Sequence, residues 1–436
     1  MKKYLLLYPP LWDFTAPYLS LPVLAGQLRN EGYNVKIVDL NIDFYLEHLT
    51  KEYIHQSIKN LHNIINSEYS TNKNITEKKY NQIKTFLDKT NNIEKIPELI
   101  SRAIEIFKKT ELFYNPQLLI SARNIIDRAT DLIFLQYDID IISDSGFGYE
   151  NIKKIVLNTK LNIFVDFYKE KIKQLNMYDY DYIGISCAGC RQIMSTLTLA
   201  NLLKNETNAH INIGGNVFSD FSADLPKYPD FFDIFADSVS CGQGEKTIIS
   251  LAKYIKGEIN INKIPNLFYK INGQVVKNKE NSDPSFSEIH MPDFSDYDLS
   301  KYIFPHIVLP LQISKGCYHN KCTFCNFCYS TKYKTKNLQC LINEIRGDIE
   351  KYNVKHFFII DESMHPLFLD KFSDEIIKNK LNIRFDIFAR IEKEFTYKVL
   401  KNAYNAGLRR IRWGLESLNK RVSALMNKGI DIDNVE

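Results

Sequence analysis

The 436-residue sequence lacks any long apolar run, and no stretch approaches the roughly 20 residues that a membrane-spanning helix requires. Its first apolar run, residues 4–8, is broken by Pro9 and Pro10 and lacks a small-residue cleavage site, unlike a secretory signal peptide. A net charge of +4 is too weak to indicate nucleic acid or an anionic membrane as a partner. The sequence therefore predicts a protein without a membrane span that does not bind nucleic acid.

Glycine is absent between Gly32 and Gly146. In the same region apolar residues recur at helical spacing, for example at Ile54, Ile58 and Leu61. This pattern predicts a helical insertion over residues 43–178, with a structural or lid-like role.

Strands and helices alternate on both sides of this insertion. We expect strands near residues 4–8, 33–40, 180–187, 210–215 and 232–245, with helices over 19–31, 188–204 and 245–257. Strands separated by helices form a parallel sheet, so residues 1–258 are predicted to be a flavodoxin-like α/β domain. A linker over 259–300 follows, with a hairpin around Asn272–Gly273.

Residues 301–436 again show strands alternating with helices. The expected strands are 307–313, 355–361, 381–390 and 408–416, and the expected helices lie near 337–352, 367–379, 394–406 and from 419. Four consecutive βα units predict a TIM-type barrel. Because the sequence ends at Glu436, we expect this barrel to be partial, with fewer units than a complete one.

Four of the eight cysteines, Cys317, Cys322, Cys325 and Cys328, lie within twelve positions. This clustering favours a reducing cytoplasm and a metal or iron–sulfur site over a disulfide framework. Three thiolates on a four-iron cluster leave one iron open to a small molecule. The alternatives are a zinc site that includes His319, and a ligand set of Cys322, Cys325 and Cys328.

We favour Cys317, Cys322 and Cys325 as the ligands, because Cys317 stands at a predicted strand end behind Gly316. The remaining cysteines are expected to be small core residues rather than ligands. These are Cys187, Cys190, Cys241 and Cys340.

Charged residues end the later barrel strands. Asp361 and Glu362 follow the second strand, Arg390 ends the third and Glu416 ends the fourth. The carboxyl ends of barrel strands are where TIM barrels place their active sites. Each residue has a simpler explanation as well: a helix cap for the two acids, an ion pair with Glu392 for Arg390, and solvation for Glu416.

The cysteine loop, SKGCYHNKCTFCNF, resembles that of the radical S-adenosylmethionine (SAM) enzymes. The segments IIDES, FDIFAR and RIRWGLESLNKRVSALMNKG are similar to later motifs of that family. Upstream, YPPLW, YIGIS, NIGGN and CGQGE resemble the cobalamin-binding domain of one large subclass. The chain departs from the family's commonest spacing, with four residues instead of three between the first two cysteines.

The resemblance implies that Cys317, Cys322 and Cys325 hold a [4Fe–4S] cluster that cleaves SAM reductively to a 5′-deoxyadenosyl radical. It also implies contacts between SAM and the strand-end residues: Asp361 and Glu362 with the ammonium, Arg390 with the carboxylate, and Glu416 with the ribose or methionine.

The same resemblance implies cobalamin at the strand ends of the first domain, near Ser186, Gly214, Gly215 and Gly244. Residues 1–42 contain no histidine, so the cobalt would not be ligated by a histidine of the first loop.

The function implied is methylation of an unreactive carbon or phosphorus in a small-molecule or peptide substrate, with a flavodoxin- or ferredoxin-type electron donor. Rearrangement without methylation is the nearest alternative within the family. Outside it, the alternatives are a non-catalytic cobalamin- or metal-binding sensor or scaffold, and a zinc-site protein.

Overall fold

The computed structural model describes residues 2–66, 77–89, 92–136, 148–159, 162–279, 285–325 and 332–432. The chain forms two compact units, which are described separately. The first unit contains residues 1–15, 20–281 and 292–305, and the second contains residues 16–19, 282–291 and 306–436.

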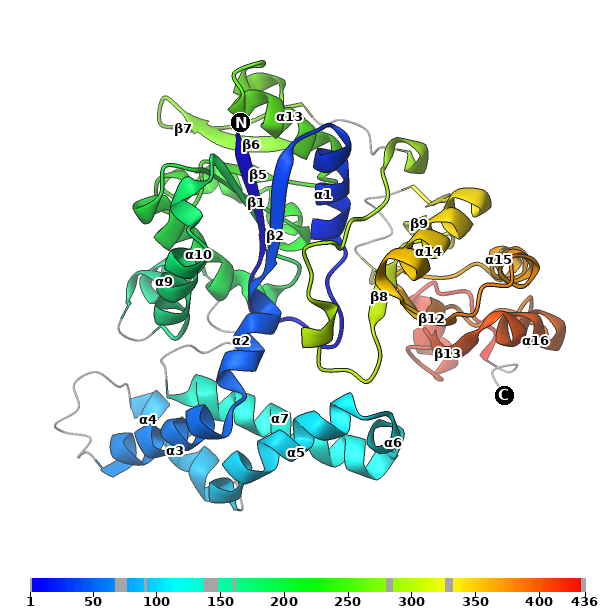
Figure 1. Ribbon diagram of the computed structural model, residues 1–436, viewed down its shortest axis with the longest axis horizontal. Coiled ribbons are helices and arrows are strands. Elements are labelled where there is room, and N and C mark those ends of the chain that lie inside the picture. Colours follow the sequence, from blue (N-terminus) through cyan, green and yellow to red (C-terminus); the bar gives the residue numbers. More distant parts are fainter. Residues whose placement is uncertain are drawn as a thin grey trace. The chain divides into compact units, whose positions relative to one another are not determined.

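The first unit is built on a seven-stranded sheet in the order β2-β1-β3-β4-β5-β6-β7 (Figure 1). The strands are β1 (Lys3–Tyr8), β2 (Asn34–Asp39), β3 (Tyr182–Ser186), β4 (His210–Gly214), β5 (Ser238–Ser240), β6 (Leu267–Ile271) and β7 (Gln274–Lys277). The first five are parallel, which confirms the predicted flavodoxin-like arrangement. Five of the six residues of β1 are buried, as expected for a central strand covered on both faces.

Four helices accompany this sheet. They are α1 (Ser20–Asn30), α9 (Phe164–Gln174), α10 (Ile193–Glu206) and α13 (Glu245–Ile255). Gly32, with φ of 77°, follows α1 in the left-handed conformation that ends many helices. The short helices α11 (Asn216–Asp220) and α12 (Phe231–Ile234) lie between β4 and β5.

The predicted hairpin belongs to the sheet of the first unit and not to a linker. The sheet therefore extends past the predicted domain boundary at residue 258. β6 pairs antiparallel with β5, and β7 pairs with β6. Asn272 and Gly273 both have positive φ, as a type I′ turn requires. The hairpin occupies the edge of β5, which would otherwise expose unpaired backbone groups.

The insertion is helical, as its lack of glycine predicted. It contains α2 (Leu40–His48), α3 (Lys51–Asn66), α4 (Glu77–Lys89), α5 (Ile96–Lys108), α6 (Thr110–Phe113), α7 (Pro116–Leu135) and α8 (Tyr149–Leu157). Ile54, Ile58 and Leu61 are buried on the inner face of α3. Helices α3, α5 and α7 pack on one another, and α2 connects them to the end of β2 (Figure 1).

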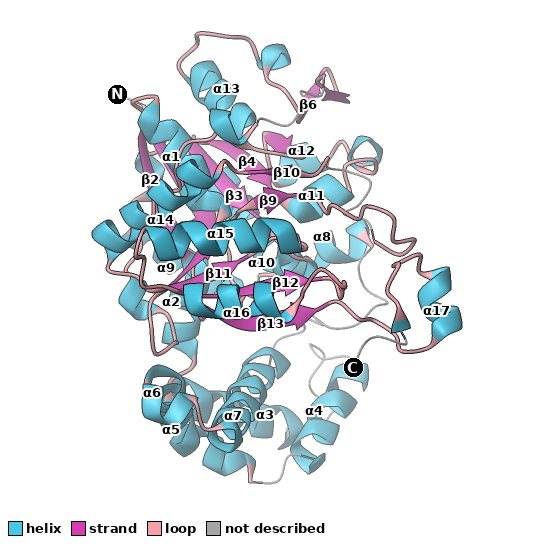
Figure 2. Ribbon diagram, turned by 90° about the vertical axis from the view of Figure 1, so that its right-hand side faces the viewer, coloured by secondary structure: helices cyan, strands magenta, loops and turns pink. Residues whose placement is uncertain are grey.

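The second unit contains a parallel four-stranded sheet in the order β13-β12-β11-β8. Its strands are β8 (Val308–Leu311), β11 (His356–Ile359), β12 (Arg384–Ala389) and β13 (Leu408–Trp413). The helices are α14 (Leu338–Tyr352), α15 (Pro366–Lys378), α16 (Tyr397–Ala406) and α17 (Lys420–Leu425). Figure 2 shows α14, α15 and α16 side by side over this sheet, in agreement with the predicted βα units.

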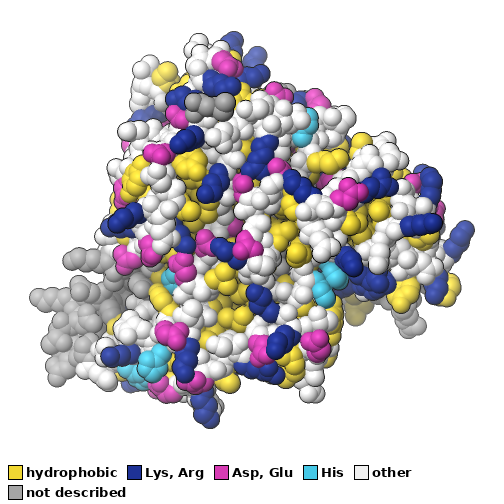
Figure 3. Space-filling view, viewed as in Figure 1, with side chains coloured by type: hydrophobic (Ala, Val, Ile, Leu, Met, Phe, Trp, Pro, Cys, Tyr) yellow, Lys and Arg dark blue, Asp and Glu magenta, His cyan; other side chains and the backbone are white. Residues whose placement is uncertain are grey.

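Within the described residues, no helix is long and apolar enough to cross a membrane. On the face shown in Figure 3, basic and acidic side chains are interspersed rather than gathered into a patch of one sign. This distribution agrees with the small net charge of the sequence.

Candidate active site

The cysteine loop is closed at its base by a two-stranded ribbon that the sequence did not reveal. β9 (Ser314–Lys315) precedes the loop and pairs antiparallel with β10 (Lys334–Thr335), which follows it. Gly316, with φ of 74°, makes the turn out of β9. The ribbon holds both ends of the loop at the carboxyl end of β8. Cys328 lies outside the described residues, so the alternative ligand set that includes it stays untested.

The three favoured cysteines share one environment. Cys322 is buried, whereas Cys317 and Cys325 are half-buried. Burial raises the pKa of the Cys322 thiol, the cations of Lys428 and Arg390 oppose this rise, and Cys317 and Cys325 add to it. The three thiols of the loop therefore lie close enough to Lys428 and Arg390, which come from other segments, for their charges to interact.

No group of three His, Cys, Asp or Glu side chains in the described part of the chain is arranged to hold a single metal ion. His319, the proposed extra zinc ligand, has its Nε2 atom 2.9 Å from the carbonyl oxygen of Asn427. That nitrogen is therefore engaged with the backbone.

Asp361 stabilises the strand end that leads into the cysteine loop. Its carboxylate accepts hydrogen bonds from the Ile313 amide (2.8 Å) and the Ser314 hydroxyl (2.6 Å). Burial raises its pKa to about 6, and these hydrogen bonds limit the rise. Neither Asp361 nor Glu362 caps α15, because His365 is the N-cap residue.

Glu362 is exposed, in contrast to its neighbour Asp361. The protein around its carboxylate nevertheless displaces enough water to raise its pKa. Of the two acids, Glu362 is therefore the more exposed residue.

Arg390 lies at the end of β12 with one unsatisfied guanidinium nitrogen. Its Nε donates to Glu392 at 3.0 Å, so the ion pair considered as the simpler explanation for Arg390 is present. Its Nη1 is buried without a hydrogen-bond partner among the described residues, as are the hydroxyls of Ser363 and Tyr318. The guanidinium lies 6.0 Å from the centre of the Tyr318 ring.

The Tyr318 hydroxyl lies near Ser363 and Glu392, although neither gives it a hydrogen bond of standard geometry within the described residues. Burial raises the pKa of Tyr318, and the nearby Ser363 hydroxyl opposes that rise. A buried polar group without a partner is destabilising, and such groups collect where a ligand supplies the missing partner. We therefore include Ser363 and Tyr318 in the candidate site, although their sequence positions gave no signal for it.

Glu416 is paired within the chain. Its carboxylate lies 2.6 Å from the Lys428 ammonium, and its φ of 63° is left-handed. The Glu416 side chain is 42% exposed whereas that of Lys428 is 8% exposed. Glu416 is therefore not simply a solvated acid, because its carboxylate is paired with the Lys428 ammonium.

The predicted cobalamin residues of the first unit lie at neighbouring strand ends. Ser186 ends β3, directly beside Gly214 at the end of β4. Gly215, with φ of 106°, is restricted to glycine because a Cβ atom would lie 2.2 Å from the Cys187 carbonyl oxygen. Gly244 precedes α13. These four residues place no bulky side chains of their own at the strand ends.

The loop after β1 reaches the same edge of the sheet. Gln192 donates from its side chain to the Pro9 carbonyl at 2.7 Å, and Ser195 donates to the Pro10 carbonyl at 3.0 Å. These bonds fix the proline loop to the start of α10. Ligands of doubly wound sheets bind at this carboxyl edge.

The other cysteines are only partly as predicted. Cys187 is buried and Cys241 half-buried, but Cys190 and Cys340 are exposed. Cys190 lies in the turn before α10 and Cys340 on the first turn of α14, whose core contacts come from other positions such as Leu341. The prediction of four core cysteines is wrong for these two.

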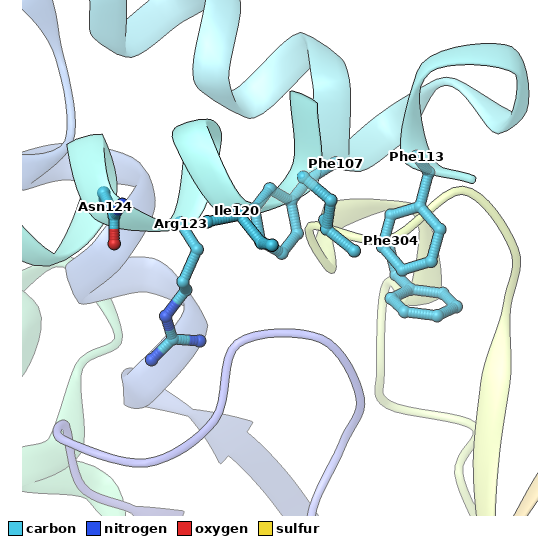
Figure 4. Close-up of a pocket in the computed structure, with 7 residues that line it drawn as sticks. Phe107, Phe113, Ile120, Arg123, Asn124 and Phe304 are labelled. Carbon is cyan, nitrogen blue, oxygen red and sulfur yellow. The ribbon is translucent and has the colours of Figure 1, made fainter. Parts of the chain in front are cut away.

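The first unit also contains an apolar hollow of about 330 Å³ in the helical insertion (Figure 4). Its walls include three aromatic rings, of which Phe113 and Phe304 pack edge to face at 4.7 Å. Arg123, at its margin, forms an ion pair with Asp127 at 2.9 Å. The lining residues are Phe107, Phe113, Leu119, Ile120, Arg123, Asn124 and Phe304.

No family model matches the sequence. An uncharacterized methyltransferase of Pyrococcus horikoshii is 24% identical over 271 residues, which cover 59% of this chain and 56% of that protein.

Two solved structures are similar across nearly the whole chain. The cobalamin-dependent SAM radical enzyme OxsB, with aqua-cobalamin bound, has a TM-score of 0.59 and 16% identity, covering 99% of this chain and 46% of its own. The radical SAM methyltransferase TsrM from Kitasatospora setae, with cobalamin and a [4Fe–4S] cluster bound, has a TM-score of 0.51 and 12% identity, covering 97% and 60%. The chain thus spans about half the length of the first proteins it resembles, and it has the fold of cobalamin-dependent radical SAM enzymes.

Proposed function

We propose that this chain is a cobalamin-dependent radical SAM enzyme that methylates an unreactive carbon of a small-molecule or peptide substrate. One observation carries the proposal: three thiols on a ribbon-closed loop lie beside unsatisfied buried donors at the carboxyl ends of parallel strands. The fold shared with OxsB and TsrM supports it.

The donor set of the cysteine loop fits an iron–sulfur cluster. Thiolates are the ordinary ligands of such clusters, and Lys428 and Arg390 place positive charge beside Cys322, where a negatively charged cluster would be stabilised. We assign Cys317, Cys322 and Cys325 as ligands. When bound, the cluster supplies the electron that cleaves SAM, and the donor of that electron would be a flavodoxin- or ferredoxin-type protein.

The unsatisfied donors fit the methionine end of SAM. Within the described residues, Arg390 Nη1 and the hydroxyls of Ser363 and Tyr318 have no hydrogen-bond partner, and a carboxylate could accept hydrogen bonds from all three. The carboxylate of Glu362, the more exposed of the two acids, is suited to accept hydrogen bonds from the ammonium. These residues would bind and orient SAM, whereas Asp361 would position the loop rather than contact the ligand.

The carboxyl edge of the first sheet fits cobalamin. The small residues Ser186, Gly214 and Gly215 leave room for a large planar ligand beside the strand ends, and the fixed loop at Pro9–Pro10 would border it. When bound, cobalamin carries the methyl group that is transferred.

Protein purified without oxygen tests the proposal through its content of iron, sulfide and cobalt. We expect a four-iron cluster and cobalamin per chain, and formation of a SAM-derived methylated product or 5′-deoxyadenosine after reduction. Cobalt without iron would support the sensor or scaffold alternative, and zinc without iron would support the zinc-site alternative; either result contradicts the proposal.

The position of the SAM carboxylate is tested separately by Ser363→Ala. Because this change removes one donor without introducing bulk, we expect weaker SAM binding by roughly 10- to 100-fold, the range of one hydrogen bond to a charged group. Isothermal titration of the reconstituted protein measures it. Ser373→Ala, at a buried serine whose hydroxyl donates to the Leu369 carbonyl within α15, is the matched control.

A further inference from the structure

Residues 425–429, which we call the C-terminal clamp, lie against the cysteine loop although about a hundred residues separate the two segments. Thr323 donates from its amide to the Met426 carbonyl (3.0 Å) and from its hydroxyl to the Leu425 carbonyl (2.9 Å). The Asn427 side chain donates to the Lys321 carbonyl at 2.9 Å. These three bonds fix the loop on both sides of Cys322.

The clamp carries a buried cation into this environment. The Lys428 side chain is 8% exposed, and its ammonium lies 2.6 Å from Glu416. It also lies 5.5 Å from the ring centre of Phe324, the residue between Thr323 and Cys325. A cation held over a loop aromatic and fixed by a single carboxylate has little freedom to move away from the cysteines.

The carboxylate of Glu416 does not cancel this charge at the loop. Glu416 is 42% exposed, so water screens its charge more strongly than that of the buried ammonium. The positive charge that Lys428 places beside the cysteine loop is therefore only partly offset by Glu416.

A cluster held by three thiolates carries negative charge, and one-electron reduction increases it. The reduction potential of such a cluster depends on the charge and hydrogen bonds around it. A fixed positive charge beside the cluster stabilises the reduced state more than the oxidised state.

We propose that Lys428 is a positioning residue whose buried ammonium raises the reduction potential of the cluster on the cysteine loop. The proposal rests on the proposed function, because it requires that the loop holds an iron–sulfur cluster. Glu416, by the same geometry, serves to hold Lys428 in place.

The test is a potentiometric titration of the reconstituted full chain, followed by electron paramagnetic resonance. Three variants are compared with the native protein: Lys428→Gln, Lys428→Arg and Lys398→Met. Lys398 is an exposed lysine of α16 and serves as the control for loss of a charge elsewhere in the same unit. We expect a more negative potential in Lys428→Gln, and potentials near the native value in Lys428→Arg and Lys398→Met.

A native reduction potential in Lys428→Gln, or an equal shift of the potential in Lys428→Gln and Lys428→Arg, overturns the proposal. If Lys428→Gln loses the cluster, the iron content of Lys428→Arg is compared with it. Iron retained in Lys428→Arg supports a requirement for the positive charge. Iron lost from both variants assigns Lys428 a packing role and overturns the proposal. Absence of iron from the native protein would be a failure of the proposed function and not of this inference.

Discussion

At the scale of single residues, the four strand-end residues predicted to contact SAM differ in what their side chains already do. The Asp361 carboxylate accepts hydrogen bonds from Ile313 and Ser314, and Glu416 is paired with Lys428. One guanidinium nitrogen of Arg390 donates to Glu392, and another has no hydrogen-bond partner in the described part of the chain. A side chain with unused hydrogen-bonding capacity is the better ligand contact, which favours Arg390.

The role of Asp361 can be separated from ligand binding by Asp361→Ala. This change leaves the Ile313 amide and the Ser314 hydroxyl without their acceptor, so we expect a loss of about 2–4 kcal/mol in the free energy of unfolding. Urea denaturation of the protein without cofactors measures it. A stability within 0.5 kcal/mol of the native value, roughly that of a neutral surface change, would contradict this stabilising role.

Asp348, on the buried face of α14, provides a pH-dependent prediction. Burial raises its pKa to about 8, and the neighbouring Glu344 adds to the rise, whereas Lys336 and Lys351 oppose it. Because the folded state binds this proton more tightly than the unfolded chain, the contribution of Asp348 to stability falls as the pH rises from about 4 to 8.

We therefore expect Asp348→Asn to gain stability relative to the native protein across that interval, by at most about 1.4 kcal/mol per pH unit. Urea denaturation of both proteins at several pH values measures the difference. A difference that does not change with pH would show that the Asp348 carboxyl has an ordinary pKa in the folded protein.

The sequence predicted the cysteines and the charged strand ends because each is marked by residue type and by position along the chain. It did not predict Ser363, Tyr318 or Lys428, whose importance depends on neighbours distant in sequence. Serine, tyrosine and lysine are common at surfaces, and only their burial beside the loop distinguishes these three.

At the scale of elements, the regular strands and helices were predictable because their patterns of apolar residues span many positions. The β9–β10 ribbon was not, because two residues on each side are too few to show any periodicity. The C-terminal clamp was not predictable either, since it uses backbone carbonyls, which the sequence does not distinguish.

The turn after β4 gives a test at this scale. Gly215→Ala would combine a positive φ with a Cβ atom 2.2 Å from the Cys187 carbonyl oxygen, so we expect a loss well above 1 kcal/mol in unfolding free energy. Gly242→Ala is the matched control, because its φ is also positive but nothing lies within 4 Å of a Cβ atom there. Equal losses in the two variants, measured by urea denaturation, would show that the close approach to Cys187 is unimportant.

At the scale of the whole molecule, the two candidate cofactor sites belong to different compact units, each with its own parallel sheet. The cysteine loop and the Arg390 region lie in the second unit, and the glycine-rich strand ends lie in the first. Each site is assembled by the carboxyl ends of its own strands, as is usual for parallel α/β sheets.

This separation predicts independent loading of the two sites. We expect the triple variant Cys317→Ala, Cys322→Ala, Cys325→Ala to lose its iron while it retains cobalamin at the native level. Metal analysis and the absorbance of bound cobalamin measure both quantities in one sample. Loss of cobalamin together with iron would show instead that the cobalamin site depends on the cluster.

As proposed, the cysteine loop holds a cluster with one iron open to SAM. The most direct measurement is the electron paramagnetic resonance spectrum of the reduced, reconstituted protein before and after SAM is added. We predict a [4Fe–4S] signal that changes when SAM binds and that is absent from the triple cysteine variant. A signal that SAM leaves unchanged, or no iron–sulfur signal at all, would contradict the account.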